Sequence, residues 1–253
     1  MNDLPAASDP RSVLRRGLSI LECFADGESD KTISELCRRT GLPPATVHRL
    51  LGVLVEWGGV EKVTRGKYRL AFRVWRLGAR VPQARTLRDV ALPYMEDLYE
   101  ATHGVVHLTI VDGIEVLYIE KISGRHAIPV TSSVGLRRPL HASGPGKVLV
   151  AFGPPDLLGR VLAAGLKPQT KKTITDEATF RRALSEIRNT GVAVTREEMS
   201  PGIASVAAPI FAGRQAVASV SVATTPDRFD AAVFTPLATT VARAITRALA
   251  REW

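Results

Sequence analysis

Apolar and polar residues in the first part of the chain follow a helical period. Apolar side chains at 13–24 recur every three or four positions, which predicts an amphipathic helix that begins after Ser12 and ends at Asp26-Gly27. Thr32 and Glu35 have the spacing of a capping box, in which each side chain satisfies the other's backbone amide at a helix start. A second helix is therefore predicted from about residue 33, and Gly41 is expected to end it.

A third helix is predicted to begin at Pro44, because proline suits the first helical position and keeps the preceding residue out of the helical region. Its apolar positions are spaced i, i+3, i+4 and i+7, and the glycine pair at 58–59 ends it. These positions are Val47, Leu50, Leu51 and Leu54. Two short alternating segments, 60–63 and 67–70, flank Thr64-Arg65-Gly66 and predict a hairpin with a basic tip.

The remaining chain mixes strand and helix patterns. Residues 85–102 are predicted to form a helix that is interrupted by Pro93. An Asp-Gly turn joins two segments of alternating apolar and polar residues, 105–111 and 114–122, and predicts a hairpin. Further strands are predicted at 203–211 and 216–223, and helices at 145–152, 154–165, 176–189 and 230–251. Hairpins combined with outer helices are typical of an α+β domain with a mainly antiparallel sheet.

Two helices joined by a glycine turn and followed by a basic hairpin form a winged helix-turn-helix, a DNA-binding module. The charge distribution supports this interpretation. The 253 residues carry 34 Lys plus Arg against 25 Asp plus Glu, a net charge of +9, and residues 62–88 hold nine basic residues and no acidic one. A basic stripe of this kind favours a polyanionic partner. The alternatives are a solvated face and a helical module that contacts protein.

The exposed side of the third helix is expected to enter the major groove of double-stranded operator DNA, while the hairpin follows phosphates. Arg49 is the strongest candidate for a guanine contact, because a guanidinium donates to two acceptors at once. The predicted DNA-binding residues are Thr46, His48 and Arg49 on the helix and Arg65, Lys67 and Arg69 on the hairpin.

From Arg15 to Gly78 the chain resembles the DNA-binding half of the IclR-type (isocitrate-lyase-regulator) transcriptional regulators, above all in TGLPPATVHRLL and GKYRL. It departs at Pro44-Ala45, where the family usually carries a polar residue and then Ser. Landmarks of the family's effector-binding half follow at 134–151, 186–210 and 217–223. The resemblance implies a GAF-like C-terminal domain with a small organic effector, assembly as a dimer or a dimer of dimers, and most often repression.

We therefore expect an α+β protein with a winged helix-turn-helix and a GAF-like effector domain. The expected boundaries are a disordered N-terminus at 1–10, the DNA-binding domain at 11–72, linker helices at 73–102 and the effector domain at 103–253. An effector that prefers one arrangement of the DNA-binding domains shifts operator affinity by its differential affinity for the two arrangements.

The glycine-rich turn at 141–147 is a candidate effector site. It is not a phosphate loop, because His141 replaces the first glycine and Val148 the hydroxyl residue of that motif. Backbone amides around Ser143 and Gly144, at a helix start, can still bind a carboxylate. The resemblance places the effector at Gly144 and Pro145, although Pro145 lacks an N–H. A tight turn without ligand is the alternative.

Small hydroxyl residues on the predicted strands are the second candidate group. Ser219 and Ser221 are two apart on a strand and so share a face. The resemblance matches Thr195, Ser205 and Ser221 with positions that hydrogen-bond the ligand, and Thr195 stands where some relatives carry Asp. The predicted effector-binding residues are thus Ser143, Gly144, Pro145, Thr195, Ser205, Ser219 and Ser221. The alternative is that small residues merely ease sheet packing.

Several function classes are excluded. Two cysteines without a CxxC spacing argue against a disulfide framework or a thiolate zinc site, and His103 and His107 fall on different predicted elements. We expect no catalytic residues, no metal, no cofactor and no membrane partner in a cytoplasmic regulator whose effector is an organic or aromatic acid. Two alternatives stay open: a ligand-free structural C-terminal domain, and a DNA-binding module fused to a residual enzyme.

Overall fold

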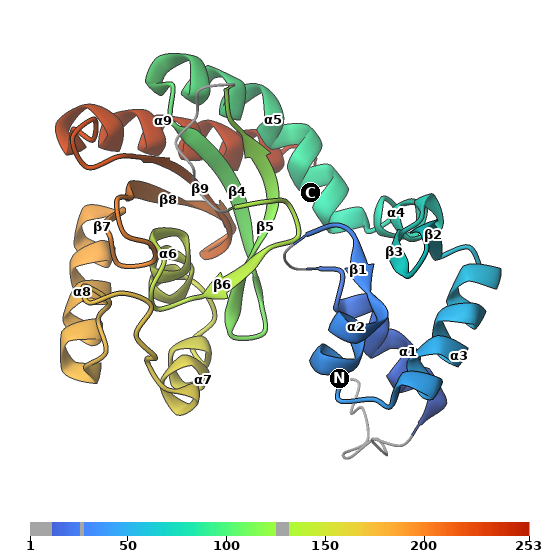
Figure 1. The fold of residues 1–253 in the computed structure, drawn as a ribbon. Coiled ribbons are helices and arrows are strands. Elements are labelled where there is room, and N and C mark those ends of the chain that lie inside the picture. The colour runs from blue at the N-terminus through green and yellow to red at the C-terminus, as the bar shows by residue number, and fades with distance from the viewer. Residues whose placement is uncertain (1–11, 26–27, 125–131, 253) are drawn as a thin grey trace. The chain divides into compact units, whose positions relative to one another are not determined.

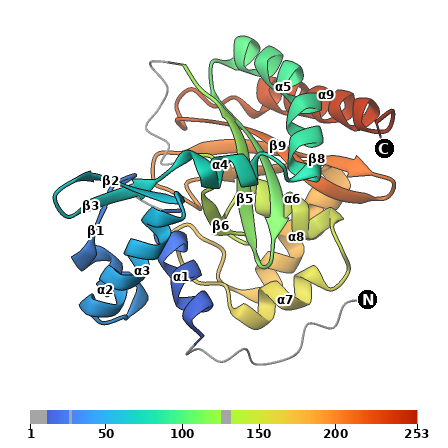
Figure 2. The same ribbon diagram turned by 90° about the vertical axis from the view of Figure 1, so that its right-hand side faces the viewer.

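Figures 1 and 2 show a computed structural model, which describes residues 12–25, 28–124 and 132–252. The chain divides into two compact units, Met1–Pro82 and Gln83–Trp253, called here the N-terminal and C-terminal units. The predicted disordered segment 1–10 lies outside the described residues. In the described part of the chain, no helix combines the length and apolar character needed to cross a membrane.

The N-terminal unit packs helices against a small antiparallel sheet of strand order β1-β3-β2 (Figure 1). Its first elements are α1 (Val13–Glu22), β1 (Lys31–Thr32), α2 (Ile33–Thr40), α3 (Pro44–Glu56), β2 (Val60–Thr64), β3 (Lys67–Leu70) and α4 (Phe72–Gly78). The core is built from the apolar positions that the helical periods predict. Ile20, Leu36, Val47 and Leu51 are almost completely buried there.

Local signals explain where these helices begin and end. Thr32 accepts a hydrogen bond from the Glu35 amide, and the Glu35 carboxylate accepts one from the Thr32 amide, so the predicted capping box is confirmed. Gly41 caps α2 in the left-handed conformation at φ +70°. Pro44 is the first residue of α3. The helix α1 ends at Glu22, earlier than predicted, and the expected stop at Asp26-Gly27 lies outside the described residues.

The short helix α4 lies at the start of the segment where linker helices are expected, at 73–102. It follows the β2–β3 hairpin directly and presents its large apolar side chains to solvent: Phe72 is 83% exposed and Trp75 is 68% exposed. Leu77 is exposed as well. Within the N-terminal unit, this helix therefore contributes an apolar surface instead of core.

The C-terminal unit contains a six-stranded antiparallel sheet of order β6-β5-β4-β9-β8-β7, with helices on both faces (Figures 1 and 2). The strands are β4 (Val105–Asp112), β5 (Glu115–Ile122), β6 (Arg137–Pro139), β7 (Ala193–Arg196), β8 (Ala204–Ala212) and β9 (Gln215–Thr224). The helices are α5 (Pro82–Thr102), α6 (Gly144–Phe152), α7 (Leu157–Ala164), α8 (Glu177–Thr190) and α9 (Ala231–Leu249). The α+β class and the mainly antiparallel sheet are thereby confirmed.

Each face of this sheet has its own apolar core. Val106, Val220 and Val222 pack on the face covered by α5 and α9. Val116 and Ala207 belong to the second core, together with residues of α6, α7 and α8. Side chains alternate along a strand, so the strand residues that alternate with Val106, Val220 and Val222 point to the opposite face, toward α6. This α6 face carries the polar residues considered next.

Candidate DNA-binding surface and effector cavity

The helix α3 separates a buried apolar side from an exposed polar side. Val47, Leu50 and Leu51 are buried in the core of the N-terminal unit, which fixes the rotation of the helix. His48 and Arg49 are consequently exposed, and the neighbouring Thr46 is half-buried. The predicted base-reading side chains thus lie at the surface of their unit. Their contacts with bases stay a prediction.

The β2–β3 hairpin presents the three predicted phosphate-binding side chains. Arg65, Lys67 and Arg69 are all exposed. The Arg69 Nε atom, however, lies 3.6 Å from an Asp30 carboxylate oxygen and 3.5 Å from one of Glu61. Those carboxylates offset part of its positive charge, although exposed pairs at such distances are weak. Arg65 and Lys67 are therefore the stronger candidates for contacts with phosphates.

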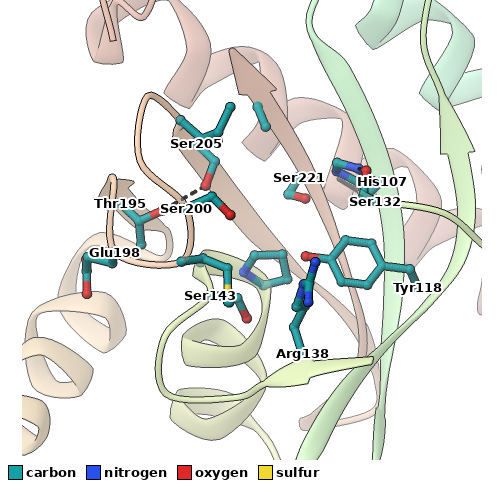
Figure 3. A pocket seen from close by; sticks show the side chains of 15 residues that line it. His107, Tyr118, Ser132, Arg138, Ser143, Thr195, Glu198, Ser200, Ser205 and Ser221 are labelled. Carbon is teal, nitrogen blue, oxygen red and sulfur yellow. Dashed lines mark hydrogen bonds between the residues drawn. The ribbon is translucent and has the colours of Figure 1, made fainter. Parts of the chain in front are cut away.

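A cavity opens on the α6 face of the large sheet (Figure 3). Together with the open space at its mouth it spans about 550 Å³. Six of the seven predicted effector-binding residues line it: Ser143, Gly144, Pro145, Thr195, Ser205 and Ser221. Sequence reasoning missed the other lining residues, which are His107, Tyr118, Ser132, Arg138, Glu198, Met199, Ser200, Ile203 and Ala223.

Ser219 is the predicted residue that the structure does not bring to the cavity. It shares a strand face with Ser221 but is absent from the lining, and its buried hydroxyl has no hydrogen-bond partner. In the sheet it stands opposite Thr109 and Pro209, whereas Ser221 stands opposite His107 and Ala207. Two residues along a strand correspond to about 7 Å, so a shared face does not imply a shared site.

The start of α6 forms one wall of the cavity. The Ser143 hydroxyl caps the helix by accepting a hydrogen bond from the Gly146 amide at 3.1 Å, and Pro145 has no amide hydrogen. Among the first three residues of α6, only Gly144 keeps an amide that the cap does not use. The backbone supply of donors to an anion is therefore smaller here than at an ordinary helix start.

Gly144 also brings α6 close to the hydroxyls of the sheet. Thr195 and Ser205 form a cross-strand pair whose side-chain oxygens are 2.8 Å apart. A Cβ atom at position 144 would lie only 3.2 Å from the Ser205 hydroxyl and 3.4 Å from that of Thr195. A glycine at 144 thus permits this close approach of helix and sheet.

The other end of the cavity is built from β4, β5 and β6. The His107 Nε2 atom is 2.8 Å from the Ser132 hydroxyl, and the His107 ring packs edge-to-face on Tyr118 with centroids 5.0 Å apart. Burial lowers the pKa of His107 to about 3. Burial likewise raises the pKa of Tyr118 to about 12, against the opposing effect of the nearby Arg138 charge. Both side chains are therefore neutral at pH 7.

A loop between β7 and β8 closes a third side of the cavity through Met199, Ser200 and Ile203. Its carboxylate at Glu198 forms an ion pair with Lys147 of α6, whose side chain is 3% exposed. Burial lowers the pKa of Lys147, and the Glu198 carboxylate opposes that shift. Thr173 further donates a 2.7 Å hydrogen bond to the Glu198 carbonyl. This cavity wall is consequently held in place by buried polar contacts.

In the described part of the chain, no three His, Cys, Asp or Glu residues are placed to hold a metal ion. His103 follows the end of α5 and His107 lies within β4, as their separation by Gly104 predicts. The described lining offers a ligand hydroxyl groups and the charged side chains of Arg138 and Glu198.

Two family models match the chain. Residues 13–64 match the IclR helix-turn-helix domain, and residues 79–251 match the bacterial transcriptional regulator IclR C-terminal domain. The curated relative XynR of Escherichia coli, an HTH-type transcriptional regulator, is 31% identical over 86% of this chain and 87% of its own. BhcR of Paracoccus denitrificans, another HTH-type transcriptional regulator, is 35% identical over 83% of this chain and 76% of its own.

Solved structures agree with the sequence relatives. An IclR homologue from Microbacterium hydrocarbonoxydans in complex with 4-hydroxybenzoate superposes with a TM-score of 0.87 at 29% identity, covering 96% of this chain and 100% of that one. The IclR structure from Thermotoga maritima has a TM-score of 0.74 at 30% identity, covering 94% and 98%. The two curated relatives are HTH-type transcriptional regulators. The chain belongs to the IclR family of DNA-binding transcriptional regulators.

Proposed function

We propose that this protein is an effector-controlled repressor that binds its operator as a dimer and responds to a small organic acid in the C-terminal cavity. The observation that carries the proposal is the meeting of six predicted effector-binding residues in that cavity. They come from α6 and from strands β7, β8 and β9, so distant parts of the sequence converge on one place. That a relative binds 4-hydroxybenzoate supports an acid as ligand.

The exposed apolar residues of the N-terminal unit support self-association. Val13, Leu14 and Leu18 of α1 are exposed, as are Phe72 and Trp75 of α4. Phe72 and Trp75 are three residues apart on α4 and so share one side of the helix, and contiguous exposed apolar side chains commonly mark a protein interface. A dimer presents two copies of α3, which then meet half-sites about 34 Å apart on the DNA. Assembly into a dimer of dimers is compatible with the same reasoning.

Regulation follows from linkage. The effector changes operator affinity only as far as it binds the DNA-competent and DNA-incompetent arrangements of the dimer with different affinity. A repressor requires that the ligand favours the incompetent arrangement. An activator requires the opposite preference, so the direction of the change in DNA affinity reports the sign of regulation.

The test combines ligand stabilisation with DNA binding. The purified full chain is screened by thermal shift against metabolic organic acids, including 4-hydroxybenzoate, and its binding to the DNA upstream of its own gene is then measured by gel shift. We expect at least one acid to raise the melting temperature and to weaken the retarded complex. Stabilisation by no acid, or an unchanged complex in the presence of a stabilising acid, contradicts the proposal.

Replacing Lys67 with alanine is expected to weaken binding to all DNA sequences alike. Its exposed ammonium lies on the β2–β3 hairpin, where a phosphate contact releases counterions. Loss of one contact should reduce the slope of log K against log salt by about one unit. The measurement is fluorescence anisotropy between about 50 and 200 mM salt. Lys171→Ala, an exposed lysine of the C-terminal unit, controls for net charge. If Lys67→Ala leaves this salt slope unchanged, Lys67 of the hairpin does not contact a phosphate.

The pair Ser221 and Ser219 provides a matched test of the cavity. Both are buried serines on β9, but only Ser221 lines the cavity. Ser221→Ala should weaken binding of a stabilising acid about 2- to 10-fold, the value of one neutral hydrogen bond. Ser219→Ala should leave that affinity unchanged, because the Ser219 hydroxyl is outside the lining and has no partner to lose. Calorimetric titration checks both, and equal effects would place the ligand elsewhere.

A further inference from the structure

The cavity has two chemically different ends. Thr195, Ser205 and Ser200 give one end neutral hydroxyls (Figure 3). At the other end Arg138 of β6 and Tyr118 of β5 point toward the same region of the cavity, beside Ser221. No motif of the sequence singled out Arg138 or Tyr118, and the proposed function does not use them.

The two charged residues of the described lining lie at different ends of the cavity: Arg138 lies at this second end, whereas Glu198 lies beside Thr195 (Figure 3). Among the described residues of the lining, Arg138 is the only cation and Glu198 the only carboxylate. The Glu198 carboxylate is engaged by Lys147 from outside the lining. His107 is neutral, because burial lowers its pKa to about 3. Among the described residues of the lining, Arg138 is therefore the group whose charge suits an anionic part of a ligand.

The start of α6 is a poor alternative for an anionic group. Pro145 has no amide hydrogen, and the Gly146 amide already donates to Ser143. A carboxylate placed there would find the single amide of Gly144. A guanidinium offers several N–H donors in a planar arrangement that matches both oxygens of a carboxylate.

We infer that Arg138 binds the carboxylate of the effector, with the Tyr118 hydroxyl as a second donor, and that the Thr195–Ser205 end binds a neutral polar group. This inference rests on the proposed function and narrows its ligand. The ligand class is an organic acid whose carboxylate lies at the Arg138 end and whose hydroxyl or carbonyl group lies at the Thr195–Ser205 end.

The structure supplies a matched control for Arg138. Its neighbour Arg137 carries the same charge on the same strand but is exposed, outside the lining, and ion-paired with Asp112. Arg138→Gln and Arg137→Gln therefore change net charge equally. Only the first removes the proposed carboxylate-binding group.

The experiment compares acids with their amides. Each stabilising acid of the thermal-shift screen is titrated calorimetrically beside its uncharged amide; 4-hydroxybenzoate and 4-hydroxybenzamide are the first pair. A hydrogen-bonded charge pair is expected to favour the acid roughly 10- to 100-fold in the unsubstituted protein. Arg138→Gln should bring the ratio of the amide and acid dissociation constants close to one, because it weakens binding of the acid and not of the amide. Arg137→Gln should leave this ratio unchanged.

The outcomes separate this inference from the proposed function. An acid preference that survives in Arg138→Gln overturns the inference and leaves the acid effector in place. If no acid stabilises the unsubstituted protein, the proposed function fails and the inference with it. Should Arg138→Gln not fold, as its own melting curve reveals, Tyr118→Phe decides, because it keeps the buried ring and removes only the hydroxyl. It should weaken acid binding about 2- to 10-fold, and unchanged acid binding overturns the inference.

Discussion

Replacing Glu198 with glutamine is expected to lower the free energy of unfolding by about 3–5 kcal/mol at pH 7, because it leaves the Lys147 ammonium buried without its anion. The Lys147 side chain is 3% exposed, so water cannot take over the role of the carboxylate. Chemical denaturation of the purified chain measures the loss. A change below about 1 kcal/mol, the value of an exposed ion pair, would contradict the buried pair.

Two further variants test the cause of this loss. Glu177 forms an exposed ion pair with Arg181 within α8, and Glu177→Gln should cost no more than about 0.5 kcal/mol. The double variant Lys147→Met with Glu198→Leu removes both charges, and apolar replacements of a buried pair are often neutral. It should therefore regain most of the stability that Glu198→Gln loses.

The loss should also depend on pH. Burial lowers the pKa of Lys147 below its ordinary value of 10.5, and without Glu198 nothing opposes that effect as strongly. Between the folded and unfolded pKa values the unfolded chain binds more protons, so stability rises with pH in that window. The deficit of Glu198→Gln relative to the unsubstituted protein should shrink as the pH increases from 7 toward 10.5. A deficit that grows over this range would contradict an unpaired lysine as its cause.

Elements governed by neighbouring residues were predictable from the sequence. The Thr32–Glu35 box, proline at the start of α3 and the left-handed Gly41 each act within a few residues, and each is found as predicted. The same holds for the two large hairpins, whose turns contain Gly113 and Gly213 at positive φ. Local backbone chemistry determines these features, so a single sequence reveals them.

The missed part of the cavity depends on contacts between distant segments. His107 lines the cavity because β4 lies beside β9, which places it directly opposite Ser221, more than a hundred residues later in the chain. Strand order is a property of the whole sheet, and no local pattern of apolar residues encodes it. Arg138 was not predicted as a cavity residue for a related reason: β6 spans only Arg137–Pro139, and a strand this short shows no alternation of apolar and polar residues.

Removing the Arg49 side chain is expected to weaken binding to the specific operator by about 1–3 kcal/mol, roughly 5- to 150-fold, and to relax base preference at one position of each half-site. Arg49 is exposed on the side of α3 opposite to the buried Val47, Leu50 and Leu51, so its guanidinium can donate to both acceptors of a guanine. Fluorescence anisotropy at fixed salt compares operator DNA with a scrambled duplex. Arg49→Lys keeps the positive charge but not the two parallel N–H donors of the guanidinium. It should bind the scrambled duplex as tightly as the unsubstituted protein does, while its affinity for operator DNA falls. If Arg49→Ala weakens both duplexes equally, Arg49 contacts phosphate and another side chain of α3 reads the bases.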